Sequence, residues 1–520
     1  MENIKSIPKE KFQFAQRSDI AHDKKLETKP VGYLQDAFRR FCKNKGSVVA
    51  AIIVLILILF AIIGPFCGHA VYENAYKTDT DITMYKNLTP KLGFMSGTGF
   101  WDGTKSEKGI NQATYYRYVG IAEETGFDSV ELLKDYTDTT TAKGRRYDIR
   151  RDLYRTIDCF TKTFTESQYK ALMAWQDEHK LQIIMPYVNN NKGFAEMKNT
   201  NVWYVCDMKG NPEFGDNGEL QPAYYTYATA EGKRDDYTSA MRLEKDPYLA
   251  GDTENGWSYA QRTGSAGAYN YVVRVNPYNY FVYKYGFEPS FAFGSDTHGY
   301  DIFTRLAGGA RFSLLFAVAV SAINLIIGAI YGAIEGYYGG KIDLVMERLS
   351  DILSALPTMV ITVLFNLHLA AKVGVVPALL YAFILTGWIG MAGSTRMQFY
   401  RFKNQEYVLA ARTLGAKDRR LMWKHIFPNA LGTLITSSVL VIPGVIFSET
   451  SLSYLGIVNL DSPTMSSVGA MLSAGRNVMT TSPHIILFPA LFIALLMISF
   501  NLFGNGLRDA FNPSLRGTEG

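Results

Sequence analysis

Residues 47–66 read SVVAAIIVLILILFAIIGPF, a run of apolar residues without a charged side chain. A helix needs about 20 such residues to cross the roughly 30 Å of hydrocarbon in a bilayer. The run therefore predicts a first membrane-spanning helix over residues 46–67. It is not typical of a cleaved signal segment, because its polar lead is long and no small-x-small pattern follows it.

Further apolar runs appear only after a long charged and tyrosine-rich interval. The shortest of them contains Asn366 and His368, polar residues that weaken it as a span. Together with the first run they predict six transmembrane helices, the last five over residues 312–334, 357–371, 375–391, 430–454 and 485–503.

Lysine and arginine concentrate in two blocks beside the apolar runs, residues 1–45 and 396–424. Such blocks occur in nucleic-acid-binding proteins, but they also mark the cytoplasmic loops of membrane proteins. Their position next to spans favours topology over nucleic-acid binding. We therefore expect both termini and the loops 335–354 and 396–424 in the cytoplasm, and residues 68 to about 310 outside.

The interval 68–289 is long enough to form a domain of its own. Thr165 and Gln168 have the spacing of a capping box and predict a helix over residues 165–180. The apolar stretch 181–188 predicts a buried strand that ends near Pro186, and the stretch KGNPEFGDNGE at 209–219 predicts a turn-rich loop. These signals indicate an inserted α+β domain.

The four cysteines carry no metal-binding pattern, because neither a CxxC pair nor a Cys/His cluster occurs. Cys159 and Cys206 both fall in the expected external domain, where a disulfide between them could persist. The sequence leaves open whether the two meet. Cys67 is not expected to carry a lipid, because Pro65 and Phe66 before it suit such a cleavage site poorly.

The loop after the fourth apolar run is the most informative segment, with the sequence NQEYVLAARTLGAKDRRLMWKHIFPNAL at 404–431. Good helix formers run from Glu406 to Leu414, Gly415 breaks them, and an amphipathic helix is predicted from Lys417 onward. Pro428 then begins the fifth span. The pattern predicts a compact protruding elbow, in which small alanine side chains allow another protein to approach closely.

This elbow resembles the coupling loop of ABC importer permeases, whose pattern is Glu-Ala-Ala, three residues, Gly, and a Pro thirteen residues later. Ala410, Ala411, Gly415 and Pro428 match that pattern with the correct spacing. Leu409 stands where the family has its Glu. Glu406 lies one turn earlier, and we hypothesise that it takes over the contact. The resemblance implies that ATPase subunits dock on these residues.

The resemblance extends to the C-type permease subunit of dipeptide and oligopeptide importers. It covers residues 33–66 and 290–515, and is carried by the stretches 33–47, 293–314, 336–357, 449–457 and 500–513. It implies an all-α polytopic membrane domain of the ABC type I importer permease kind, with the α+β extracytoplasmic domain inserted after the first span. The expected division is a cytoplasmic segment 1–45, a first span 46–67, the insert 68–289, a permease core 290–506 with coupling loop 396–428, and a cytoplasmic tail 507–520.

The resemblance also implies the function and the partners. Such a permease moves dipeptides or oligopeptides across the bacterial cell membrane by alternating access. It works with two ATPase subunits, a second homologous permease and an extracytoplasmic peptide-binding protein, while membrane lipid surrounds it. Other members of the family carry nickel or sugars.

No G-x-x-x-x-G-K-[ST] phosphate-binding loop occurs in the chain. We therefore expect no cofactor on this chain and no enzymatic activity of its own, with ATP and magnesium bound by the partner subunits.

Polar residues inside spans are costly in hydrocarbon and tend to face a bundle interior or an aqueous path. Asn324, Glu449 and Asn501 are the candidates for a translocation pathway, and Glu449 is the only acid in 430–454. The alternative for each is a hydrogen bond between helices.

A membrane-anchored receptor or enzyme that acts through the external domain is the alternative function. His69, His179 and His298 are present, but their spacing assembles no catalytic group. The external domain could also dock a binding protein or cover the mouth of the pore. The elbow favours the transporter, because a receptor has no use for it.

Overall fold

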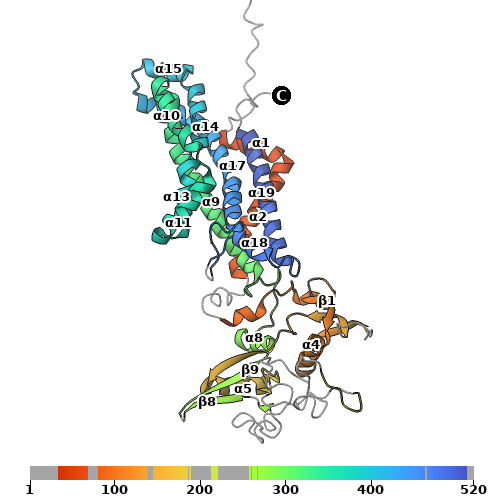
Figure 1. Ribbon diagram of the computed structural model, residues 1–520. Helices are drawn as coiled ribbons and strands as arrows, with labels where there is room; N and C mark the ends of the chain where they lie inside the picture. The colour runs from red at the N-terminus through yellow and green to blue at the C-terminus, as the bar shows by residue number, and fades with distance from the viewer. Residues whose placement is uncertain are drawn as a thin grey trace, which may run out of the picture.

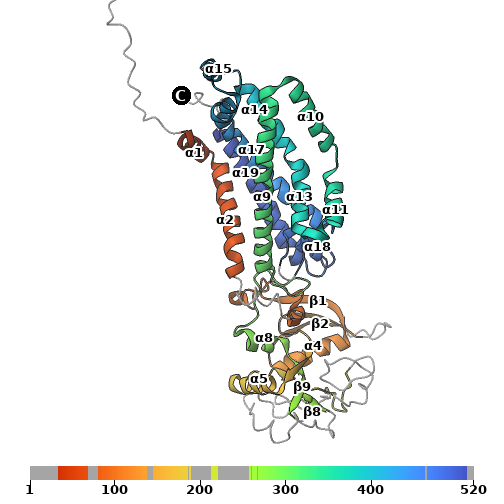
Figure 2. The same cartoon turned by 90° about the vertical axis from the view of Figure 1, so that its left-hand side faces the viewer.

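The computed structural model describes residues 33–67, 80–136, 145–185, 187–188, 212–218, 220, 257–258, 260–265, 267–462 and 465–511. Long helices form a bundle, and a unit of strands and short helices lies at one end of it (Figures 1 and 2). We call this the sheet end of the bundle. The opposite end carries the elbow and is called the elbow end.

Five helical segments within the described residues are long and apolar enough to cross a membrane. They are Lys45–Phe66 in α2 (Lys45–Cys67), α9 (Ile302–Tyr338), α13 with α14 (Val375–Gly387, Ile389–Phe402), Asp418–Tyr454, which ends in α17 (Phe427–Tyr454), and α19 (His484–Phe511). Their length and apolarity agree with the sequence-based prediction for five of the six spans.

The third span differs from the prediction. Residues 335–354 were expected to form a loop, but α10 (Gly340–Ser354) occupies most of that range and joins α11 (Thr358–His368) at a bend of 71°. By length and apolarity the two together suit one broken span or a re-entrant loop, and the total is six when they are counted as one span. Pro357 explains the bend, because proline lacks an N–H and disfavours helix in the residue before it. A short helix, α12 (Ala370–Val373), follows.

Small residues bring α9 and α14 into close contact. Gly328, Gly332 and Gly336 repeat every fourth residue along α9 and face α14. A Cβ on Gly332 would stand 2.1 Å from the carbonyl oxygen of Ala392. Close backbone approach of this kind is how helices pack in membranes, where lipid supplies no hydrophobic driving force between them.

The remaining core of the bundle joins α2, α9, α17, α18 (Val468–Arg476) and α19 through buried apolar side chains. The short helix α1 (Tyr33–Lys43) packs on the far end of α19, where Phe41 and Phe503 meet edge to face at 5.7 Å. The first described residues and the end of α19 therefore both lie at the elbow end (Figure 1).

The first sheet of the sheet-end unit has the order β1-β3-β2 and is antiparallel. Helix α4 packs on it through Tyr118 and Ile121, which share a buried cluster with Tyr147 and Ile149 of the central strand. Asn111 caps α4 with its side chain. The elements are β1 (Thr104–Asn111), α4 (Gln112–Thr125), β2 (Val130–Tyr136) and β3 (Arg146–Asp152).

The second sheet is built on β9, which pairs antiparallel with β4, β5 and β8. Helix α5 (Glu166–His179) covers it, with the predicted capping box between Thr165 and Gln168 confirmed. The strands are β4 (Phe160–Thr165), β5 (Ile184–Met185), β8 (Ala260–Ser265) and β9 (Ala268–Val275), followed by α8 (Pro277–Tyr285).

The single strand predicted over 181–188 is divided in two. Ile184 and Met185 of β5 are fully buried and pair with β9, whereas β6 (Tyr187–Val188) pairs with β7 (Trp257–Ser258) in a separate sheet. The predicted turn-rich loop is present where it is described, as a turn closed by a bridge between Phe214 and Leu220. Cys206 and His69 lie outside the described residues.

Two short segments connect the sheet-end unit to the bundle: 3-10 helix η3 (Thr80–Tyr85) with the residues after it, and the stretch from Phe287 to the start of α9. Gly294 shows how tightly they fit, since a Cβ there would lie 2.4 Å from the carbonyl oxygen of Leu88 and 2.8 Å from the ring of His484. The positive φ of +78° at Gly294 also requires glycine.

Candidate functional site: the elbow and the pocket at the sheet end

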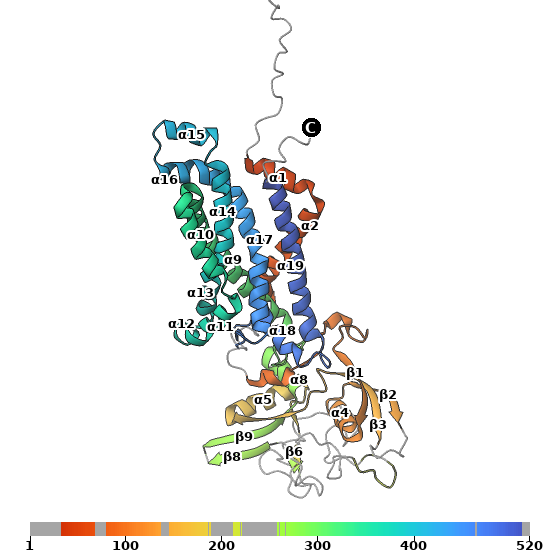
Figure 3. The same cartoon turned by 45° about the horizontal axis from the view of Figure 1, so that its top comes forward.

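The elbow begins with α15 (Glu406–Thr413) and turns at Gly415, whose φ is +83°. A short helical turn, α16 (Asp418–Arg420), then continues through a π-helical turn, η6 (Leu421–Ile426), into α17. The predicted helix, glycine turn and second helix are therefore present. Figure 3 shows that α15 protrudes beyond the helices at the elbow end.

A small apolar cluster holds the elbow on the bundle. Val408 is fully buried, although the α15 residues on either side of it are exposed. It packs with Leu421, Met422 and Ile426, which share one buried face, and with Ala333, Tyr337 and Phe399. Tyr337 also donates a hydrogen bond from its Oη to Oδ1 of Asp418 at 2.5 Å. These contacts link the elbow to α9, α14 and α17.

The elbow exposes apolar side chains beside small ones and charged ones. Leu414 is 87% exposed, Leu409 is 43% exposed, and Ala410 beside Leu409 is also exposed. Exposed apolar side chains clustered on a protrusion are typical of a protein contact surface. Glu406 and Pro428 are exposed and Ala411 is half-buried.

Part of the basic block serves packing between helices. Arg396 forms paired hydrogen bonds to Asp343, at 2.6 and 2.9 Å, and to Glu347, at 2.8 and 3.1 Å. Lys403 donates to the carbonyl oxygen of Gly336 at 2.9 Å. These cations fasten α14 to α10 and α9. The cations that stay exposed around the elbow include Arg412, Lys417, Arg419, Arg420 and Lys424.

The three predicted pathway residues lie on three different helices. Glu449 of α17 is fully buried and accepts hydrogen bonds from Ser313 Oγ at 2.8 Å and Ser453 Oγ at 3.2 Å. Asn324 of α9 is buried against Gly387, where a Cβ would stand 2.3 Å from Nδ2. Asn501 of α19 is exposed. Glu449 and Asn324 therefore make contacts between helices, and the structure does not bring the three together.

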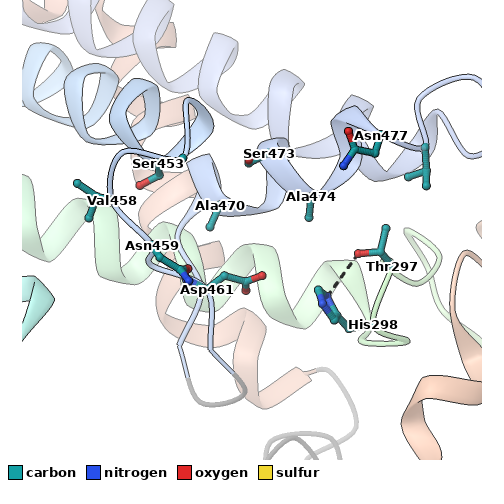
Figure 4. A pocket seen from close by; sticks show the side chains of 12 residues that line it. Thr297, His298, Ser453, Val458, Asn459, Asp461, Ala470, Ser473, Ala474 and Asn477 are labelled. Atoms are coloured by element: carbon teal, nitrogen blue, oxygen red, sulfur yellow. Dashed lines mark hydrogen bonds between the residues drawn. The ribbon is translucent and has the colours of Figure 1, made fainter. Parts of the chain in front are cut away.

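A pocket of about 520 Å³ opens at the sheet end. It lies between the end of α17, α18 and the segment before α9, and several polar side chains point into it (Figure 4). Thr297 Oγ1 and His298 Nδ1 are 3.4 Å apart at its rim. The lining residues are Thr297, His298, Ser453, Gly456, Val458, Asn459, Asp461, Ala470, Ser473, Ala474, Asn477 and Val478.

Of the lining residues, only His298 was named individually from the sequence, without a role, while Thr297, Ser453 and Gly456 fall in the family-like stretches 293–314 and 449–457. The sequence does offer one signal for the pocket. Polar residues, among them Asn459, Asp461 and Asn477, occur in the interval between the fifth and sixth spans. Periodicity does not reveal such a pocket, because its walls come from two distant parts of the chain.

Buried charges support the wall of the pocket. Arg305 is nearly buried, forms an ion pair with Asp461, and has its Nε 3.5 Å from Oδ2 of Asp296. Burial raises the pKa of Asp296, although Arg305 opposes the shift. Burial raises the pKa of Asp301 to about 6, and hydrogen bonds from Thr304 limit the shift.

Cys159 is buried, and whether it pairs with Cys206 stays as open as the sequence left it. Across the described residues, no three His, Cys, Asp or Glu side chains come together in a way that could hold a metal ion.

Two family sequence models match the chain. Residues 324–517 match the family described as the binding-protein-dependent transport system inner membrane component, and residues 32–90 match the N-terminal TM domain of oligopeptide transport permease C. The elbow lies within the first match. The second match extends 23 residues past Cys67, so the family-like N-terminal part includes η3 and reaches beyond the boundary expected at residue 68.

Curated relatives give the same result. The oligopeptide transport system permease protein OppC of Bacillus subtilis is 44% identical over 224 residues, 43% of this chain and 72% of that protein. The dipeptide transport system permease protein DppC of the same organism is 40% identical, over 43% of this chain and 69% of the relative. OppC of Haemophilus influenzae is 41% identical, over 43% of this chain and 70% of that protein.

Among solved structures, the inward-facing methionine ABC transporter MetNI matches with a TM-score of 0.34 and 14% identity, over 40% of this chain and 96% of that chain. This similarity is too low to support a conclusion about the present chain.

Proposed function

This chain belongs to the ABC transporter permeases, in the family of the C-type oligopeptide and dipeptide permease subunits, and we propose that it imports oligopeptides or dipeptides. It is a multi-pass membrane permease and not an enzyme. In the proposal, separate ATPase subunits bind ATP and magnesium and drive alternating access, while this chain supplies part of the path.

The observation that carries the proposal is the elbow. ATPase subunits dock on Leu409, Ala410 and Leu414, with Glu406, Ala411, Gly415 and Pro428 shaping the contact. A displacement of α15 passes through Val408 to Leu421, Met422 and Ile426, because these side chains pack together. Since η6 continues into α17 without a break, α17 moves with the elbow.

The proposed orientation places the elbow end in the cytoplasm. The exposed cations around α15 support it, because cytoplasmic loops accumulate Lys and Arg. In that orientation both termini are cytoplasmic and the α+β unit is an extracytoplasmic domain. The pocket then lies at the outer mouth of the bundle, where peptide enters, and Glu449, Asn324 and Asn501 stay candidates for the path further in.

The full assembly in this proposal contains two ATPase subunits, a second homologous permease and an extracytoplasmic peptide-binding protein. Exposed apolar side chains on α10 and α11, such as Val345, Ile352 and Leu367, give the second permease and lipid a surface to cover. The α+β domain supplies a further contact for the binding protein above the mouth.

Purification of the intact assembly through a tag on this chain tests the proposal. We expect ATPase subunits, a second permease and bound peptide to co-purify, and mass spectrometry identifies each of them. A chain that purifies alone and transports without an ATPase contradicts the proposal.

A further inference from the structure

A glycine-rich segment, residues 91–103 with the sequence KLGFMSGTGFWDG, displays aromatic side chains. We call it the aromatic loop. Phe94 is 85% exposed and Phe100 is 61% exposed. Exposed phenylalanines on one short loop mark a surface that contacts something less polar than water.

The loop is held in a defined shape. Leu92 N–H donates to the carbonyl oxygen of Trp101 at 2.8 Å, and Gly99 N–H donates to Oδ2 of Asp102 at 2.8 Å. The same carboxylate pairs with Arg150 of β3 at 2.9 Å. Glycines with φ near +80° allow the tight turns. The exposed rings are therefore a stable feature of this fold, fixed to the first sheet.

Contacts to α19 set the height of the loop relative to the membrane. The Trp101 ring stacks on Phe488 with centroids 6.1 Å apart, and its Nε1 donates to the carbonyl oxygen of Ala292 at 2.7 Å. Phe488 is in the second turn of the apolar helix α19, about 6 Å along the axis from His484 at 1.5 Å per residue. Figure 3 shows this orange segment beside the start of α19, at the sheet end.

For an α19 that crosses the membrane, this height is that of the membrane interface, where tryptophan and tyrosine concentrate. A stripe of exposed apolar side chains starts beside Phe488 and continues along α19 through Leu487, Leu491, Leu495 and Ile498. The aromatic loop is thus continuous with a helix face that suits acyl chains.

We propose that the aromatic loop inserts Phe94 and Phe100 into the lipid leaflet at the sheet end and anchors the α+β unit to the bilayer. The partner of the two rings is lipid, because the aromatic loop lies beside the first turns of the apolar helix α19 and next to its stripe of exposed apolar side chains. This inference requires only that α19 crosses the membrane, and it is independent of what the transporter carries.

Photo-crosslinking of the intact assembly in its native membrane tests the inference. The photoreactive analogue p-benzoylphenylalanine replaces Phe94 in one variant and Phe100 in a second. Phe214 is the control position, because it is also an exposed phenylalanine but lies on the far part of the sheet-end unit, against Tyr116 of α4.

After irradiation, we expect tryptic peptides containing position 94 or 100 to gain the mass of a phospholipid, with fragmentation placing the adduct on an acyl chain. Position 214 gives no such adduct. An adduct to another protein, or no lipid adduct at either loop position, overturns the inference. Peptide uptake is measured on the same membranes. Loss of uptake tests the proposed function, whereas the lipid adduct tests the position of the aromatic loop, so the two results can be told apart.

Discussion

At the scale of single residues, Gly415 is the position on which the elbow depends most directly. Its φ of +83° lies in the left-handed region, which costs a residue with a Cβ roughly 1–2 kcal/mol. No atom stands within 4 Å of the position a Cβ would take, so the cost comes from the backbone alone. Glycine therefore fixes the direction in which α15 projects.

Gly415→Val is expected to reduce peptide uptake and stimulated ATPase activity roughly five- to thirtyfold, because roughly 1–2 kcal/mol changes an equilibrium population by that factor. Transport assays in membrane vesicles measure the effect. Gly267→Val is the matched control, since Gly267, just before β9, has a φ of +91° and equally open surroundings outside the elbow and the aromatic loop. Equal losses of uptake and ATPase activity in both variants would contradict the assignment of the elbow to coupling.

A second prediction at this scale concerns Asp301, the N-cap of α9, whose burial raises its pKa to about 6. A carboxyl with a raised pKa favours the folded state at low pH, and this contribution is lost as pH rises through about 6. Asn caps a helix as well as Asp does.

Asp301→Asn should therefore flatten the dependence of thermal stability on pH. Scanning fluorimetry of the purified assembly between pH 5 and 7.5 measures it, with a smaller fall in Tm expected in the variant than in the parent. Burial also raises the pKa of Asp296, so this residue keeps part of the pH dependence of stability in the variant. Parallel curves for the two proteins would contradict the prediction.

At the scale of elements, the glycines of α9 decide how closely two spans pack. Gly332 touches the backbone of α14, while Gly308 on the same helix has nothing within 4 Å of a Cβ. The two positions differ only in what they face, so they form a matched pair.

Gly332→Ala is expected to destabilise the bundle by about 1–3 kcal/mol, the typical cost of overpacking. Gly308→Ala should be neutral or slightly stabilising, because alanine is the better helix former. The apparent Tm of both variants in the same detergent tests this. A Gly332→Ala protein as stable as the parent would show that the helices separate without cost.

The elements at the sheet-end junction also restrict how the α+β unit can be removed. Residues 80–103 contact the segment before α9 and the start of α19, through Leu88 with Ser295 and Trp101 with Phe488. They belong to the base of the bundle and must be kept in any deletion.

At the scale of the whole molecule, the α+β unit lies in the chain between the first apolar helix and the rest of the bundle, and our proposal treats it as an addition to the permease. Replacing residues 104–286 by a short flexible linker should leave membrane insertion and assembly with the ATPases intact. Capture of the binding protein and uptake should both fall. Co-purification and vesicle transport measure the two effects, and unchanged values for both would exclude a docking role for the unit.

Several features of this architecture could be predicted from sequence because they depend on residues close together in the chain. The length of an apolar run defines a span, as in α2, and the pair Thr165 and Gln168 defines the start of α5. Gly415 and its flanking helix formers define the elbow in the same way.

The tertiary structure decided the features that join distant residues. The bent pair α10 and α11, the pairing of Arg305 with Asp461, and the aromatic loop against Phe488 each depend on packing between segments. Arg305 and Asp461 are 156 positions apart, and no periodicity links them. Local propensity acts over a few residues, whereas burial and ion pairing depend on which surfaces meet. The chain sequence therefore determined the spans and the elbow. The tertiary structure alone determined the pocket, the ion pairs of Arg305 beside it and the height of the aromatic loop along α19.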